Sequence, residues 1–153
     1  MPYADELNYW KTGKSAPDKI IDNVLEMIRR AGGQPVAQAY GMEPATGRSA
    51  FMVEFIMAEQ LYKVVWPVLP VKHPGTVNIR AARIQAATML SHDVKARLIS
   101  ARVLGSRKAL FAYLVLPGGQ VASDLISPSL IAEIPAMLGG SELIALTEPE
   151  ISE

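Results

Sequence analysis

Residues 49–66 read SAFMVEFIMAEQLYKVVW, and this stretch decides the fold. Apolar side chains occupy every second position from Phe51 to Met57, with Met52, Glu54 and Ile56 between them. This period of two is typical of a β-strand. Ala58-Glu59-Gln60 is short enough for a hairpin turn into a further strand over residues 61–66. The stretch therefore predicts two antiparallel strands.

The preceding residues predict one more strand and a helix. A strand over Gln34 to Met42 leads into the second strand through the turn at residues 43–47. Before it, Ser15, Pro17 and Asp18 indicate a helix start, with Ser15 as the cap, and Gly32-Gly33 indicates its end. The three central strands are then consecutive and antiparallel.

The following residues predict a long helix and further strands. The helix runs from Thr76 or Asn78 to Leu104 and is apolar on more than one side, which indicates packing across the sheet. Apolar residues over Lys108 to Leu116 predict a fourth strand, and Gln120 to Ala122 a short fifth one. A last helix starts at Ser127 and is interrupted at Pro135. The order α-β-β-β-α-β-(β)-α predicts an α+β fold with a three- to five-stranded antiparallel sheet.

The 153 residues predict one domain with two appendages. Residues 1–14 are expected to form an arm that carries Tyr3, Tyr9 and Trp10, residues 15–146 the domain, and residues 147–153 an acidic tail. The start of the chain lacks the apolar run of a signal peptide, and no apolar stretch approaches the length that spans a bilayer. Together with the absence of cysteine, this predicts a cytoplasmic protein with no membrane partner.

Charge is unevenly distributed, although the net charge is zero. The segment from Lys72 to Lys108 holds eight basic residues and one acid, Asp93, whereas residues 109–153 hold six acids and no Lys or Arg. Such a pattern is typical of polyanion-binding or self-assembling proteins. The alternative is that the basic segment is an ordinary solvated helix surface with no binding role. Around the long helix, Lys95 and Arg102 point in similar directions with Arg80 near them, while Arg83 and Arg97 turn toward the apolar side.

No catalytic or metal-binding constellation is visible. Gly13-Lys14-Ser15 lacks the upstream glycine of a phosphate-binding loop, because position 8 is Asn8. The two histidines, His73 and His92, lack the spacing of zinc ligands. His92 cannot activate the adjacent Ser91, since neighbours on a helix point about 100° apart. We therefore predict no enzyme, no catalytic residue, no metal and no cofactor.

Several segments resemble an uncharacterised protein family of bacteriophages and integrated mobile elements. They are residues 81–87 (AARIQAA), 92–98 (HDVKARL) and 111–119 (FAYLVLPGG), with QAYG at 38–41 and WPVLP at 66–70 upstream in the same order. The resemblance implies a phage context and no catalytic residue. The order α-β-β-β-α is also that of double-stranded RNA-binding domains, and single-strand annealing proteins combine a similar sheet with a long helix. Only Arg80 and Arg83 stand where the former carry a lysine cluster, and likeness of fold does not carry function.

Two functions follow as hypotheses. The first is a non-enzymatic, oligomeric accessory protein of phage type that binds the backbone of DNA or RNA, single- or double-stranded, without sequence preference. Its candidate residues are Arg80, Lys95, Arg102, Arg107 and Lys108 for phosphates, and Tyr9 and Trp10 for bases. The alternative is an oligomeric assembly or protein-binding module without nucleic acid. In it, the acidic C-terminal segment meets the basic block of the next chain, and the strand from Leu110 to Leu116 pairs between subunits.

Overall fold

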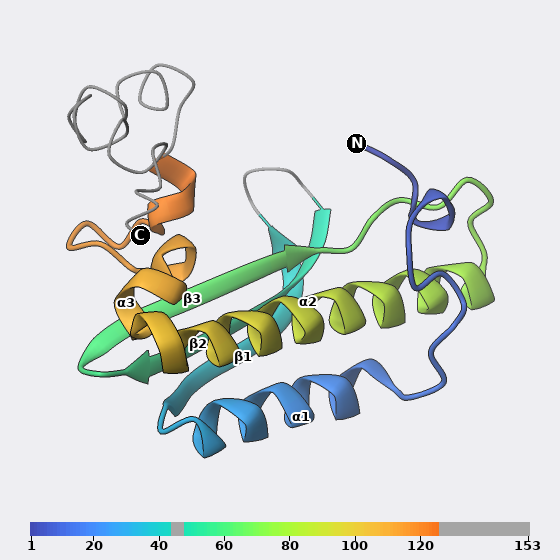
Figure 1. The fold of residues 1–153 in the computed structure, drawn as a ribbon. Helices are drawn as coiled ribbons and strands as arrows, with labels where there is room; N and C mark the ends of the chain where they lie inside the picture. Colours follow the sequence, from blue (N-terminus) through green and yellow to red (C-terminus); the bar gives the residue numbers. More distant parts are fainter. Residues whose placement is uncertain (44–47, 126–153) are drawn as a thin grey trace, which may run out of the picture.

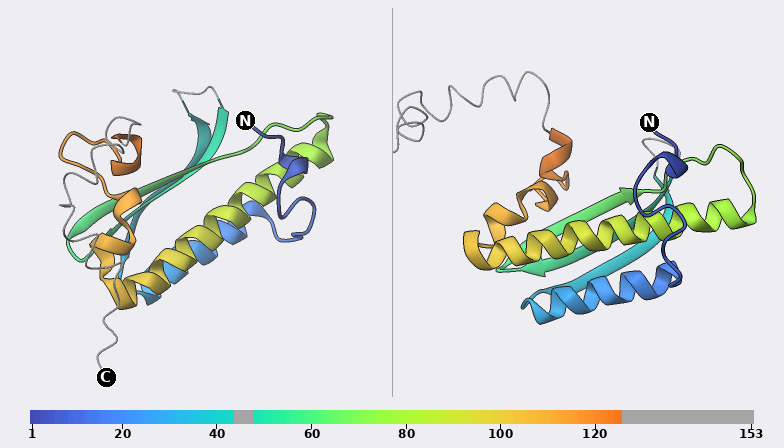
Figure 2. Two further views of the ribbon diagram at one scale, coloured as in Figure 1. Left: turned by 45° about the horizontal axis from the view of Figure 1, so that its top comes forward. Right: turned by 45° about the vertical axis from the view of Figure 1, so that its right-hand side comes forward.

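A three-stranded antiparallel sheet forms one layer of the molecule and two helices form the other (Figure 1). The structure, a computed structural model, describes residues 1–43 and 48–125. The sheet order is β1-β2-β3, with β1 at Gln34–Glu43, β2 at Arg48–Met57 and β3 at Gln60–Pro67. Both helices, α1 (Pro17–Arg30) and α2 (Thr76–Leu104), lie on the same face of the sheet (Figure 2). The predicted α+β fold, with three antiparallel strands and a long helix across them, is confirmed.

The core lies between the sheet and the helices, as the strand pattern predicts. Phe51, Val53, Phe55 and Met57 of β2 are all buried, and Phe55 stacks on Tyr62 of β3 with ring centroids 5.6 Å apart. Leu90 and Val94 of α2 and Ile28 of α1 close this core and are wholly buried. The helix α2 is therefore central, and part of its opposite side carries the N-terminal arm.

The hairpin between β2 and β3 turns through two residues with left-handed backbone. Met57 pairs with Gln60, while Ala58 and Glu59 have φ angles of 48° and 65°. A tight turn with two positive φ angles matches the twist of the strands but favours Asn-Gly. Both side chains are thus held in a backbone region that suits glycine better.

Replacing Glu59 with glycine is expected to stabilise the protein by about 0.5–1 kcal/mol, because relief of the left-handed strain outweighs the added freedom of the unfolded chain. Chemical denaturation measures the change. The matched control is Glu26→Gly in α1, which is expected to destabilise by roughly 0.5–1 kcal/mol. A loss of stability in Glu59→Gly would contradict this interpretation of the turn.

Helix α1 begins slightly later than the sequence indicates. Pro17 is the first helical residue and Ala16 the cap, with no side-chain cap hydrogen bond. The predicted capping role of Ser15 is therefore wrong: Pro17 begins the helix, and its fixed φ suits that position. The predicted end holds, since Gly32 has a φ of 91° and the Gly33 amide donates to the Ile28 carbonyl.

The predicted fourth and fifth strands are wrong. Gly105 (φ 89°) ends α2 as predicted, but residues 106–109 form the short helix α3 (Ser106–Ala109) and residues 111–113 a 3₁₀ turn. Single β-bridges join Tyr62 to Leu114 and Val115 to Val121, and Ala122 already starts a second 3₁₀ turn over Ala122–Leu125. A nearly continuous apolar run fits a buried helical turn as well as a strand. The strand that the assembly hypothesis pairs between subunits is therefore not present.

A hydrogen bond and an ion pair connect the segment after Gly105 to α2. The Tyr113 hydroxyl donates to the Asp93 carboxylate, which also accepts from Arg97 Nε at 2.9 Å. Burial, together with the hydrogen bond to Asp93, raises the pKa of the Tyr113 hydroxyl well above its ordinary value. The Arg97 guanidinium also lies 4.7 Å from the Tyr113 ring centroid. These contacts with Asp93 and Arg97 explain why Tyr113 turns inward rather than extending along β3.

The predicted last helix from Ser127 and the acidic tail lie outside the described residues.

Candidate nucleic-acid interface

The structure divides the eight cations of the basic segment into two groups. Three make contacts within the domain: Lys72 with Glu6, Arg83 with the Tyr40 ring, and Arg97 with Asp93. The other five make no ion pair, side-chain hydrogen bond or ring contact within the part of the chain that the structure describes; they are Arg80, Lys95, Arg102, Arg107 and Lys108. All five are exposed, and they are the five residues that the sequence analysis predicts as phosphate contacts.

Two of these five residues meet at a groove between the helices. Lys95 and Arg102 of α2 line it together with Arg30, the last residue of α1. The groove has a volume of about 490 Å³, and its walls are otherwise the apolar side chains of Met27, Ala31, Leu98 and Ile99. Lys95 and Arg102 are two helical turns apart, about 10 Å along the axis. The groove thus presents three cations around an apolar floor.

A stacked ring pair extends this groove along α2. His92, Lys95, Ile99 and Arg102 are spaced by three or four residues and so share one side of the helix. The Tyr9 ring stacks on His92, with centroids 4.9 Å apart and planes 12° apart. Tyr9 itself has a φ of 68°, unusual for a residue with a large side chain. The arm therefore holds an exposed aromatic ring one helical turn from the first cation of the groove.

The arm is fixed on α2 by a buried glutamine. Gln85, which is 1% exposed, donates from Nε2 to the carbonyls of Ala4 and Asn8 at 2.7 and 2.9 Å. The Ala4 amide donates in turn to the Pro70 carbonyl at 2.8 Å. Lys72 pairs with Glu6 at 3.1 Å, which lowers the pKa of Glu6 and raises that of Lys72. The arm therefore packs on its own domain.

Replacing Gln85 with leucine is expected to release the arm, because the buried Ala4 carbonyl loses the side chain that donates to it. The free energy of unfolding should fall by roughly 1–3 kcal/mol, and trypsin should cleave after Lys11 and Lys14 faster than in the unmodified protein. Gln120→Leu, at an exposed position, is the control and should change neither quantity. Unchanged cleavage in Gln85→Leu would show that other contacts hold the arm.

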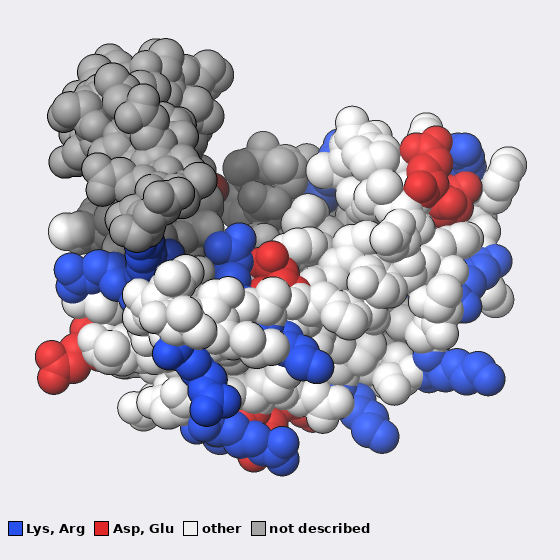
Figure 3. Space-filling model, in the orientation of Figure 1, with Lys and Arg blue, Asp and Glu red and all other residues white. Residues whose placement is uncertain are grey.

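The remaining predicted residues lie outside the groove. Arg107 and Lys108 line a neighbouring hollow of about 680 Å³ at the end of α2, next to Leu104 and Phe111. Arg80 is fifteen residues before Lys95, about 22 Å away along the axis of α2. Trp10 is half-buried with the Lys11 Nζ 5.4 Å from its ring centroid. Figure 3 shows Lys and Arg side chains spread along this helical face of the molecule.

Sequence reasoning missed Arg30 and the His92 ring. Arg30 is far from the basic segment in sequence, and only the packing of α1 beside α2 brings it to the groove. Its Nε lies 3.4 Å from Glu26, in an exposed pair that competes little with a ligand. The sequence does show the pair Arg29-Arg30 at the end of an amphipathic helix. Cations are favoured at that position by the helix dipole, so the pair by itself did not indicate a binding site.

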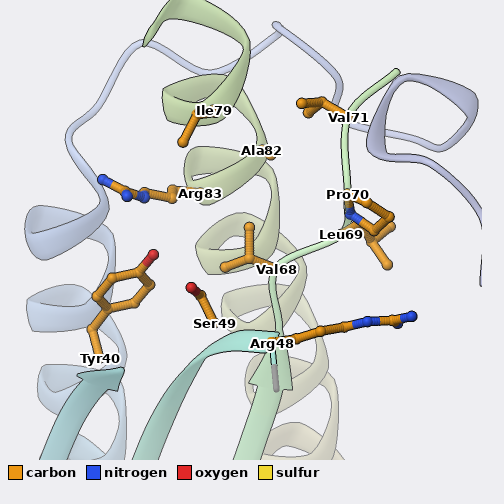
Figure 4. A pocket seen from close by; sticks show the side chains of 10 residues that line it. All are labelled: Tyr40, Arg48, Ser49, Val68, Leu69, Pro70, Val71, Ile79, Ala82 and Arg83. Atoms are coloured by element: carbon orange, nitrogen blue, oxygen red, sulfur yellow. The ribbon is translucent and has the colours of Figure 1, made fainter. Parts of the chain in front are cut away.

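A smaller pocket lies at the opposite end of the domain (Figure 4). It holds about 210 Å³ between the end of the sheet, the loop at residues 68–71 and the first turns of α2. Arg83 lies over the Tyr40 ring at 5.3 Å, and the Arg48 side chain points away from the pocket centre. Because its walls are largely apolar and Arg83 already contacts the Tyr40 ring, this pocket is less suited to binding an anion than the groove is.

Two further features of the described residues bear on function. No three His, Asp or Glu side chains converge as a metal site would require within residues 1–43 and 48–125. None of the helices in this part of the chain combines the length and apolarity that crossing a membrane would take. Comparisons of the chain with known protein families, with curated proteins and with solved structures found no match in any of the three.

Proposed function

We propose that this chain is a non-enzymatic accessory protein of phage type that binds the nucleic-acid backbone without sequence preference. The observation that carries the proposal is the groove in which Arg30, Lys95 and Arg102 surround an apolar floor beside the Tyr9–His92 ring pair. Cations that neutralise phosphates release counterions, and this release drives sequence-independent binding. Arg107 and Lys108 extend the cationic surface beyond the groove.

The ring pair favours single strands over duplexes. Tyr9 is 37% exposed, so its ring can take an unpaired base on its free side. Stacking on an aromatic ring contributes about 1–3 kcal/mol per base and tolerates any base, because every base has a π-face. A duplex offers no unpaired base to this ring. We therefore expect single-stranded DNA or RNA to bind more tightly than duplex DNA.

Self-association would strengthen a binder with few phosphate contacts. Exposed apolar residues gather after the groove, where Val103 is 83%, Leu104 52% and Phe111 50% exposed. A homo-oligomer that covers them would place several grooves on one strand, and linked sites bind far more tightly than single ones. Light scattering at micromolar concentration should then show a mass above that of the monomer.

The second candidate, a protein-binding module without nucleic acid, is favoured by one observation. The floor of the groove is apolar through Met27, Leu98 and Ile99, and Ile99 is 58% exposed. An acidic amphipathic peptide would match such a floor with a cationic rim. The two candidates differ in what they predict for an oligonucleotide.

Titration of labelled oligonucleotides, followed by fluorescence anisotropy at low salt, separates the candidates. Backbone binding predicts micromolar binding of single strands of unrelated sequence with closely similar affinities, and weaker binding of duplexes. Marked preference for one sequence would require contacts to base edges and would contradict the proposal. Failure of every oligonucleotide to bind, together with binding of an acidic amphipathic peptide, would favour the protein-binding module.

A further inference from the structure

Strand β1 forms an edge of the sheet whose backbone is free to pair with a further strand. Within residues 1–43 and 48–125, β1 pairs with β2 alone, and its backbone makes no hydrogen bond outside that pair. One row of N–H and C=O groups, at alternate residues of β1, therefore points away from β2. Figure 1 shows β1 at the border of the sheet, with α1 alongside it.

Most of this edge lacks the features that keep other strands away. Folded proteins usually protect an open edge with charged residues, prolines or bulges. In β1, Pro35 and the shift of register between Pro35 and Ala37 protect only the start of the strand. Residues 37–42 (AQAYGM) contain neither a charge nor a proline, and Tyr40 and Met42 are 44% and 73% exposed. This part of β1 is therefore suited to the addition of an extended segment.

An acidic groove lies between this edge and α1. It has a volume of about 280 Å³, and its lining includes Asp18, Ile21 and Asp22 of α1 and Gln38 and Tyr40 of β1. Asp18 and Asp22 are one helical turn apart and so share one side of α1. Both are exposed, and neither has an ion pair or hydrogen bond with any other described residue. Asp18 in the first turn suits the helix dipole, but this does not explain Asp22, which lies one turn further on.

The occupant that this chemistry selects is an extended peptide with basic side chains. In a strand added beside β1, every second side chain points to the side of the sheet on which α1 lies. A Lys or Arg at these positions meets the carboxylates of Asp18 and Asp22. The β1 strand of a second copy fits less well, because residues 34–42 contain no cation. Two β1 strands joined antiparallel around a twofold axis would also bring both α1 helices to the same side of the sheet, with their carboxylates facing one another.

We propose that the β1 edge and the acidic groove beside it bind an extended protein segment with Lys or Arg at alternate positions, which adds to the sheet as a fourth strand. Backbone hydrogen bonds to residues 37–42 provide the affinity, and the carboxylates of Asp18 and Asp22 select basic side chains. The proposal is independent of the proposed function, because no residue of the cationic groove lines the acidic one.

Hydrogen exchange of the full chain, followed by NMR with and without a short peptide of alternating lysine and valine, tests the proposal. At about 1 mM peptide, the amides of residues 37–42 that do not donate to β2 should exchange at least about twofold more slowly. A peptide of alternating glutamate and valine is the control and should give no protection. Absence of protection by the lysine peptide, or equal protection by both peptides, would overturn the proposal. Protection that needs no peptide and increases with protein concentration would assign the edge to a second copy instead.

Reversal of one carboxylate provides a second measurement. Asp22→Lys should weaken binding of the lysine peptide about fivefold, because an attraction between exposed charges is replaced by a repulsion. Glu59→Lys in the turn between β2 and β3 changes the net charge equally but lies outside the acidic groove, so it should change the affinity by less than about twofold. Both side chains are exposed, so the fold should be unaffected. Equal affinities of the two variants for the lysine peptide would overturn the proposal.

Discussion

Replacing Lys95 and Arg102 together with alanine is expected to weaken binding of a single-stranded oligonucleotide by about 25-fold at 0.1 M salt. For a single strand, each phosphate contact contributes about 0.7 to the slope of log affinity against log salt, so two contacts contribute about 1.4 logarithmic units at that concentration. Both side chains are exposed, so the fold should be unaffected. Anisotropy titration at several salt concentrations measures both the affinity and the slope.

The matched control removes two cations elsewhere. Lys14 lies just before α1 and Lys19 near its start, and neither lines the groove, so Lys14→Ala/Lys19→Ala gives the same net charge away from it. At 0.1 M salt, interactions between exposed charges are largely screened beyond about 10 Å. The control should therefore lose far less affinity. Equal losses in the two double variants would mean that binding depends on net charge and not on the groove.

Replacing Leu90 with alanine is expected to destabilise the domain by roughly 2–5 kcal/mol. Leu90 lies on the side of α2 that faces the sheet and is wholly buried within the core cluster. Removing its branched end leaves a cavity in this core cluster that closely packed neighbours cannot fill completely. Urea denaturation, with comparison of the midpoint and the slope, measures the loss.

Val103→Ala provides the comparison on the same helix. Val103 is 83% exposed, so its truncation should change stability by about 0.5 kcal/mol or less. If Leu90→Ala also costs well under 1 kcal/mol, then α2 does not pack across the sheet as described.

The sheet and the long helix could be predicted because local pattern and tertiary packing agree there. The strand ends were predicted to within one residue of their observed positions. The features that predicted them are the alternation along β2, the short turn after it, and proline at positions 67, 70 and 74. Gly105 marks the end of α2 because its positive φ suits glycine. The segment after Gly105 could not be predicted in this way, since Tyr113 turns inward toward Asp93, twenty residues earlier in the chain. Strand propensity contains no information about such a partner.

The candidate site could be predicted only in part. The helical period places Lys95 and Arg102 on one side of α2, and both line the groove. The contribution of Arg30 depends on the packing of α1, and the place of Tyr9 depends on the hydrogen bonds of Gln85 to the arm. Neither contact follows from local sequence. The helical period also turns Arg83 and Arg97 away from that side, and both make contacts within the domain, as Lys72 does with Glu6.

The dependence of oligonucleotide affinity on salt concentration tests the central proposal most directly. Three to five cations at and beside the groove predict a slope of log affinity against log salt of about −2 to −3.5 for a single strand. The unmodified protein should bind strands of unrelated sequence along the same line. A slope near zero, or no binding at tens of micromolar protein at low salt, would contradict a role in binding the nucleic-acid backbone.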